Sequence, residues 1–148
     1  MKISTKGRYA ILILVDIAQH GETQNVSLKD IAARQKLSVK YLEQIATLLC
    51  KAGMLRSERG PQGGYRLAED PSELTIGKIL RLTEGSLTPV ACLEYDTIPC
   101  VRGDICISRD FWDGLYRRIC DYIDHYTLED MLRSSRSGTE ADIISKEG

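Results

Sequence analysis

The fold of this chain is decided by residues 27–67, which read SLKDIAARQKLSVKYLEQIATLLCKAGMLRSERGPQGGYRL. Two helices joined by a few residues are predicted at the start of this stretch. Ser27 begins the first with a pattern like a capping box, and Ser38 precedes the second, which runs from residue 39 to residue 52. Apolar side chains recur at helical spacing along the second helix, at Tyr41, Leu42, Ile45, Leu48 and Leu49. This arrangement is typical of a helix-turn-helix.

A β-hairpin is predicted directly after the second helix. Two short extended runs, residues 54–58 and 65–67, flank the turn Arg59-Gly-Pro-Gln-Gly-Gly64, and Gly and Pro between extended runs indicate a hairpin. A helix-turn-helix followed at once by a hairpin is a winged helix. Upstream, residues 5–20 are apolar on nearly all sides, which predicts a buried helix that ends at Gly21 in a left-handed C-cap.

The remainder is predicted to be helical apart from one loop. An amphipathic helix covers residues 75–84, and a long helix with one wide apolar stripe covers residues 110–126. A short helix restarts at Thr127, and the polar, acidic tail from about residue 134 is expected to be loose. The expected fold class is mostly α with a small β-hairpin wing, a winged helix-turn-helix followed by a long helix.

These elements divide the chain into four expected segments. Residues 1–85 form the winged helix-turn-helix domain, and residues 86–109 form a loop that carries three cysteines. Residues 110–133 form the long helix and the short helix after it. Residues 134–148 form a flexible tail.

The composition is that of a globular chain, with 148 residues, 43% of them hydrophobic, and a net charge of −1. No apolar run approaches the ~20 residues of a membrane span, and a secretion signal is absent, so we expect a cytoplasmic protein without membrane contact. Residues 1–70 hold 11 Lys and Arg against 7 Asp and Glu, whereas residues 71–148 hold 9 against 14. A basic N-terminal half suits contact with phosphates. Two histidines and no catalytic constellation predict that the chain is not an enzyme.

The second helix of the pair and the wing carry the residues expected to contact DNA. Gln44 suits a bidentate contact to adenine, and Glu43 suits the amino group of cytosine. Arg59 suits a minor groove, because the glycines beside it allow close approach of the backbone. The expected DNA contacts are Ser38, Lys40, Tyr41, Glu43, Gln44, Arg59, Gly60 and Gly63. Two alternatives to DNA contact stay open: the helix face can simply be solvated, or the winged helix can be a protein-interaction module.

Three cysteines, Cys92, Cys100 and Cys106, are spaced C-x7-C-x5-C in a loop rich in turn-forming residues. Such a loop can bring three thiolates together, and thiolates are the ligands of soft metals and iron–sulfur clusters. Zinc is less expected, because the usual C-x2–4-C pairs are absent. The fourth ligand is open, either a residue from another helix or subunit or one of Glu94, Asp96, Asp104, Ser108 and Asp110.

Other roles for the loop also stay open. Cys100 and Cys106 can pair on oxidation as a metal-free redox switch, the three thiols can hold zinc structurally, or they can have no role. Cys50 and Cys120 lie on apolar helical stripes and are expected to be buried core residues.

Four stretches together resemble the Rrf (type two) family of bacterial winged-helix transcription regulators. They are residues 1–10, 41–44 and 59–65 and the cysteine loop, and the similarity extends from residue 1 to about residue 133. The resemblance implies a homodimer that binds a palindromic double-stranded DNA operator, with the long helix of residues 110–126 crossing its partner. It also implies that the three loop cysteines (Cys92, Cys100, Cys106) hold a [2Fe–2S] or related cluster.

The chain departs from the subgroups of this family at two positions. IscR-like members have a histidine three residues after the last cysteine, where this chain has Arg109, and NsrR-like members have an acidic residue where it has Arg8. The resemblance to these subgroups therefore does not identify the fourth ligand in this chain. The head resembles the CymR-like members, which lack the three cysteines. The chain is thus similar to an IscR-like sensor on a CymR-like head.

The function expected from these patterns is a dimeric DNA-binding transcription regulator that senses iron–sulfur or redox status through a cysteine-ligated cluster. One alternative is a metal-free repressor of cysteine or sulfur metabolism, controlled by a partner protein or by thiol oxidation. Another is a small iron–sulfur electron carrier, against which the cationic wing argues.

Overall fold

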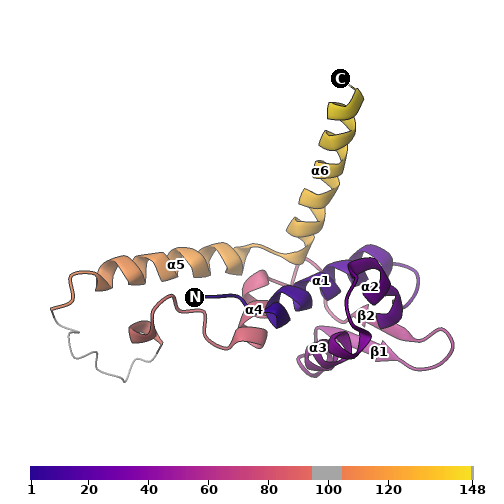
Figure 1. Cartoon of the computed structure of the whole chain (residues 1–148), viewed down its shortest axis with the longest axis horizontal. Helices are drawn as coiled ribbons and strands as arrows, with labels where there is room; N and C mark the ends of the chain where they lie inside the picture. Colours follow the sequence, from indigo (N-terminus) through magenta and orange to yellow (C-terminus); the bar gives the residue numbers. More distant parts are fainter. Residues whose placement is uncertain (95–104, 148) are drawn as a thin grey trace.

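The computed structural model describes residues 1–94 and 105–147, with the backbone alone for residues 138–147. Helices dominate these residues, and the two strands form one antiparallel hairpin (Figure 1). The elements are α1 Thr5–His20, α2 Leu28–Gln35, α3 Val39–Lys51, β1 Leu55–Glu58, β2 Gly64–Leu67, α4 Ile76–Glu84, the 3-10 turn η1 Ala91–Leu93, α5 Arg109–His125 and α6 Leu128–Glu147. The predicted fold class is confirmed.

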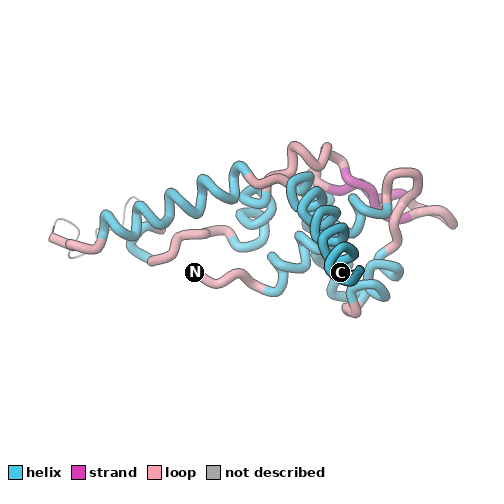
Figure 2. The backbone as a smooth tube through the Cα atoms, turned by 90° about the horizontal axis from the view of Figure 1, so that it is seen from above, coloured by secondary structure: helices cyan, strands magenta, loops and turns pink. Residues whose placement is uncertain are grey.

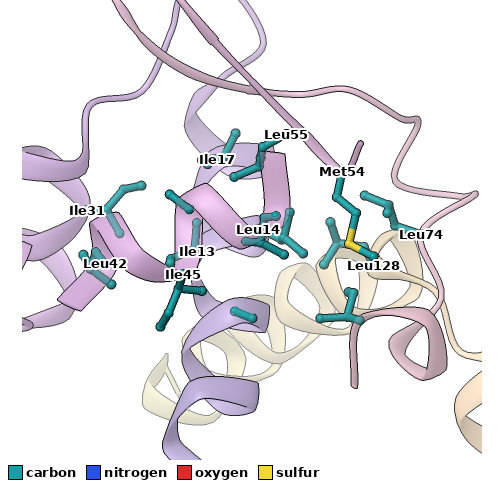
Figure 3. Close-up of a cluster of buried hydrophobic side chains, with 14 of the residues drawn as sticks. Ile13, Leu14, Ile17, Ile31, Leu42, Ile45, Met54, Leu55, Leu74 and Leu128 are labelled. Carbon is teal, nitrogen blue, oxygen red and sulfur yellow. The ribbon is translucent and has the colours of Figure 1, made fainter. Parts of the chain in front are cut away.

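Helix α1 lies at the centre of the core and packs against α3, α4, β2 and α6. Figure 3 shows its side chains Ile13, Leu14 and Ile17 among Leu42 and Ile45 of α3. All five are at most 1% exposed, and each such burial stabilises the fold by about 1.5–3 kcal/mol. The apolar pattern of residues 5–20 therefore predicted a buried helix correctly.

The end of α1 differs from its prediction. Gly21 has φ −99°, so it is not a left-handed cap. The Gly21 N–H still makes the helical bond to the carbonyl of Ile17 at 2.7 Å, and the backbone leaves the helix at Gly21 itself, with ψ 14°. A Cβ at Gly21 would press into that carbonyl, so the position needs glycine for space rather than for a positive φ.

The helix-turn-helix is formed by α2 and α3. Ser27 Oγ accepts a hydrogen bond from the Asp30 N–H at 3.1 Å, as the capping pattern predicts. Lys36, with φ 55°, reverses the chain after α2. Ser38 occupies the N-cap position of α3 without a side-chain cap bond, and α3 ends at Lys51, one residue earlier than predicted.

The hairpin of β1 and β2 forms the predicted wing. Its register pairs Leu55 with Leu67 and Glu58 with Gly64. The loop before α2 adds a third segment, because Val26 and Tyr65 exchange two backbone hydrogen bonds of 3.0 and 2.8 Å. Helix α3 also packs against β1, so the helix-turn-helix and the wing form one unit.

The C-terminal helices join the head through α4. The Ile76 N–H donates to the Tyr126 carbonyl at 2.8 Å, and the Leu128 N–H donates to the Leu74 carbonyl at 2.8 Å. Farther along, Arg81 of α4 forms two hydrogen bonds with Asp124 of α5. Figures 1 and 2 show α5 extending from the head on the side away from the hairpin.

Helix α6 is longer than the sequence predicted. The short helix expected from Thr127 runs for 20 residues, from Leu128 to Glu147, through the segment expected to be loose. The stretch contains no proline, so nothing removes a backbone donor and local hydrogen bonding continues. The segment boundaries and the flexibility of residues 134–148 stay predictions. No helix within the described residues is long and apolar enough to cross a membrane.

Candidate DNA-binding face and cysteine site

The polar face of α3 is exposed to solvent. Lys40, Glu43 and Gln44 are all exposed, and so is Ser38 at the N-cap. Within the described part of the chain, the side chains of Lys40, Glu43 and Gln44 have no hydrogen-bond or ion-pair partner. Their polar groups are therefore available to a ligand, while the opposite face of α3 is buried in the core.

Tyr41 lies at the boundary between the two faces of α3. It is half-buried, and its ring meets that of Tyr9 edge to face, with 5.7 Å between the ring centroids. Such contacts contribute about 0.5–1.5 kcal/mol beyond area burial. Tyr41 therefore fixes the rotation of α3 on α1, in addition to any contact it makes outward.

The wing turn presents Arg59 to solvent. Arg59 and Gly60 are exposed, and the Gly63 N–H donates to the Gly60 carbonyl at 2.9 Å. Gly60 has φ 112°, a conformation that favours glycine. A Cβ at Gly63 would meet the Glu58 carbonyl, so this turn also needs glycine for space.

Asn25 anchors the wing, and sequence reasoning missed it. Its Nδ2 donates to Glu58 Oε2 at 2.8 Å and to the Gln62 carbonyl at 3.1 Å. The partners are 33 and 37 residues away in sequence, so no local pattern indicates the contact. The available signal was an Asn two residues before the N-cap Ser27, which predicts a turn rather than a cross-link.

The described cysteines of the loop lie at its two ends. Cys92 is exposed on η1, and Cys106 is half-buried, with its Sγ 3.4 Å from Ser108 Oγ. Cys100 lies outside the described residues, together with Asp96 and Asp104. Among the residues that are described, no three His, Cys, Asp or Glu side chains converge closely enough to hold a metal ion.

Cys92 opens onto a pocket of about 400 Å³ between η1 and the first turns of α5. Asp110 also lines it, so one of the predicted fourth-ligand candidates shares a cavity with the first cysteine. Arg109 and Arg117 line the same cavity, and Arg117 forms an ion pair of 2.7 Å with Asp113. The residue types that line this pocket suit a cysteine-ligated cluster. Thiolates ligate iron, and nearby cationic side chains offset the negative charge of the ligands.

Comparison with known proteins identifies the family. Residues 3–134 match the Rrf2 family, described as "Iron-dependent Transcriptional regulator". The chain belongs to the Rrf2 family. It is 34% identical to the HTH-type transcriptional regulator IscR of Photobacterium profundum, over 98% of this chain and 86% of that protein.

Two solved structures support the same assignment for this Rrf2-family chain. CymR (YrzC), the global cysteine regulator of B. subtilis, is 38% identical with a TM-score of 0.76, over 90% of this chain and 98% of that one. IscR of T. potens is 40% identical with a TM-score of 0.73, over 91% and 88%. The chain is a transcriptional regulator of the IscR and CymR type and not an enzyme, as the sequence predicted.

The cysteines outside the loop differ in their surroundings. Cys50 packs against the core, and burial raises the pKa of its thiol. Cys120 is also half-buried, but it is not among the side chains packed against the core, and it lies near enough to Arg81 and Tyr116 to raise the pKa of both. The interaction with Cys120 is the main reason that the pKa of Tyr116 is raised. The expectation of a core residue thus suits Cys50 better than Cys120.

Helix α5 of this Rrf2-family chain exposes an apolar stripe. Phe111 is 64% exposed, Tyr122 67% and Leu115 37%, and these positions lie on one face at helical spacing. Only Ile123 of α5 is buried. The wide stripe seen in the sequence is therefore only partly used by the chain's own core.

Proposed function

We propose that this Rrf2-family regulator is a homodimer that binds a palindromic operator through α3 and the wing. The observation that carries the proposal is the exposed polar face of α3 held beside an anchored wing. In this proposal the N-terminal half of α3 enters the major groove, with Lys40 and Ser38 near the phosphates and Glu43 and Gln44 at base edges.

The wing makes the second proposed contact with DNA. Arg59 reaches the minor groove, and Gly60 and Gly63 keep the backbone close to the DNA. Tyr41 supports α3 through its contact with Tyr9. Glu43 acts by exclusion, because a carboxylate that finds no donor on the base edge is repelled by DNA.

Replacing Gln44 tests the base-reading role. Gln44→Ala should lower discrimination between the operator and singly mutated operators by about 1–3 kcal/mol, because one bidentate contact is lost. The measurement is a binding titration against a panel of operator variants at fixed salt. Gln19→Ala, an exposed position on α1, serves as the matched control. Unchanged discrimination in Gln44→Ala would remove this residue from the proposed interface.

The dimer in this proposal forms through α5. Phe111, Leu115 and Tyr122 present more apolar surface than a solvated helix needs. A second copy crossing the same face would cover it and would set two copies of α3 against half-sites one turn apart, ~34 Å.

We further propose that Cys92, Cys100 and Cys106 hold a [2Fe–2S] or related cluster, with the fourth ligand open. Asp110 is the candidate best supported, because it lines the pocket with Cys92. Such a group, when bound, supplies a redox-active and labile centre. Arg109 and Arg117 would offset its negative charge.

The position of these cysteines supports a regulatory role. Cys106 lies three residues before Arg109, the first residue of α5, so a change in what the thiols bind acts on the first turn of α5. Arg81 and Asp124 couple α5 to α4, and α4 packs on α1 in the head. A small shift of α5 would therefore alter the separation of the two recognition helices and the affinity for DNA.

Anaerobic purification tests the cluster. The full-length protein should be coloured and should contain iron and acid-labile sulfide, and Cys92→Ala and Cys106→Ala should lose both while keeping their helical circular dichroism. Cys50→Ala, whose thiol packs against the core, is the control and should keep the colour. Retention of iron in both loop variants would contradict the assignment.

A second candidate is a metal-free repressor of cysteine or sulfur metabolism. The similarity to the global cysteine regulator CymR at 38% identity favours it. A colourless, iron-free protein that binds promoter DNA normally, and whose DNA binding changes on thiol oxidation or with a partner protein, would support this candidate over the first.

A further inference from the structure

A pocket of about 500 Å³ lies on another part of the molecule, where the end of α1 meets the hairpin and the start of α6. It shares no lining residue with the pocket beside Cys92. Figure 1 shows α6 rising from the head on the side opposite α3, so a molecule in this pocket would not compete with DNA for the recognition helix.

Four arginines from two separate parts of the chain line this pocket. Arg56 and Arg66 are cross-strand partners in the hairpin, and Arg133 and Arg136 lie one turn apart on α6. Within the described residues, the guanidinium groups of Arg56, Arg66 and Arg136 have no carboxylate within ion-pairing distance. Four guanidinium groups in one pocket repel one another, and the three acidic residues that also line it leave a net positive charge, which favours binding of an anion.

Arg66 gives the strongest indication of a bound anion. Its Nε is buried and has no hydrogen-bond acceptor. A buried donor without an acceptor destabilises a fold by about 1–3 kcal/mol, so such groups are rare and call for an explanation. A bound anion that accepts from Arg66 would remove this cost.

Two of the three acidic residues of the pocket, Asp70 and Glu129, are engaged, whereas Glu22 has no hydrogen-bond or ion-pair partner within the described residues. Asp70 accepts hydrogen bonds from the Ser72 N–H and hydroxyl at 2.9 and 2.7 Å, which lower the pKa of Asp70. Glu129 lies 3.8 Å from Arg133. None of the three carboxylates is ion-paired with Arg56, Arg66 or Arg136 in the part of the chain that the structure describes. Apolar side chains of Ile17, Leu67 and Leu132 complete the wall.

We propose that this pocket binds a small organic anion whose carboxylate or phosphate group is held by Arg66 and Arg136. The guanidinium fork suits either headgroup, since both accept two parallel N–H bonds. The volume suits a metabolite-sized molecule, and the apolar wall suits a short hydrocarbon body. The ligand joins β2 of the wing to α6, so its binding links the C-terminal helix to the DNA-binding unit.

Calorimetric titration of the full-length protein with inorganic phosphate and with malonate, without DNA, tests the proposal. Sodium chloride at matched ionic strength is the reference. At least one of the two probes should bind at one site per chain and raise the midpoint of thermal unfolding. Binding of phosphate alone supports a phosphate ester as the natural ligand, and binding of malonate alone supports a carboxylate.

Two variants and one control locate the site. Arg66→Gln should weaken binding by about tenfold or more, since a charge-assisted contact is lost. Arg136→Gln, at an exposed position of α6, should weaken it similarly without risk to the hairpin. Arg8→Gln, exposed on α1, should bind as the parent does. The proposal is overturned if neither probe exceeds chloride, or if both Arg66→Gln and Arg136→Gln bind like the parent. Either result would leave the DNA-binding proposal standing.

Discussion

At the scale of single residues, Asp16 shows how one buried charge orders the head. Its side chain is 1% exposed, and it accepts hydrogen bonds from Arg34 Nη2 at 2.6 Å and from Gln35 Nε2 at 3.1 Å. Burial alone would raise the pKa of Asp16, but the bonds from Arg34 and Gln35 outweigh it and hold the pKa below its usual value of 3.8. The carboxylate thus joins α1 to the end of α2.

Asp16→Asn should lower the free energy of unfolding by about 1.5–3 kcal/mol at neutral pH, because hydrogen bonds to a charged group are lost. The native pKa is depressed, so the contribution of Asp16 is fully present above the unfolded value and is lost as pH falls through the native value. Chemical denaturation from pH 7 down to pH 3 measures this. The difference between parent and variant should be constant above about pH 5 and shrink below it. A difference independent of pH would assign the loss to packing.

At the scale of elements, α4 lies close to α1 and to α5 because a glycine stands at each of the two contacts. A Cβ at Gly7 of α1 would press into the Glu84 carboxylate, and a Cβ at Gly77 of α4 would press into the Asp124 carboxylate. Ser4 Oγ donates to Glu84 Oε1 at 2.6 Å at the first contact, and Arg81 bonds Asp124 at the second. Each close approach is therefore coupled to a polar bond that crosses the same seam.

Gly77→Ala should destabilise the protein by on the order of 1–3 kcal/mol, because the added methyl displaces Asp124 from Arg81. Gly114→Ala is the matched control, since no atom of the described residues lies within 4 Å of a Cβ at that helical position. There the substitution should be neutral or stabilise by up to about 1 kcal/mol. Thermal unfolding of both variants checks the contrast, and equal effects would show that the α4–α5 seam tolerates the methyl.

At the scale of the whole molecule, the exposed stripe on α5 determines the assembly that we propose. Leu115→Glu places a charge on that stripe and should convert the dimer to a monomer, with operator affinity falling by about a hundredfold because the two half-sites are no longer linked. Sedimentation equilibrium and DNA titration measure the two effects. Leu12→Glu is the control, because Leu12 of α1 is also 37% exposed. A dimeric Leu115→Glu protein would place the interface elsewhere.

The sequence by itself determined the local elements and their class. Capping at Ser27, apolar spacing along α3 and the glycine-rich turn after Arg59 act over a few residues, so pattern alone predicts the winged helix. The exposed polar face of α3 follows from the same spacing. The assignment of Gly21 as a left-handed cap was wrong, since glycine is also used where a Cβ has no room.

The tertiary structure alone decided which distant residues meet. Asn25 reaches the wing across 33 residues, Arg66 and Arg136 line one pocket, and Cys120 lies near Arg81 of α4. Such contacts depend on how helices and the hairpin cross, and no periodicity in the chain encodes a crossing. The length of α6 also escaped prediction, because a polar stretch without proline can extend a helix that begins at an anchored end.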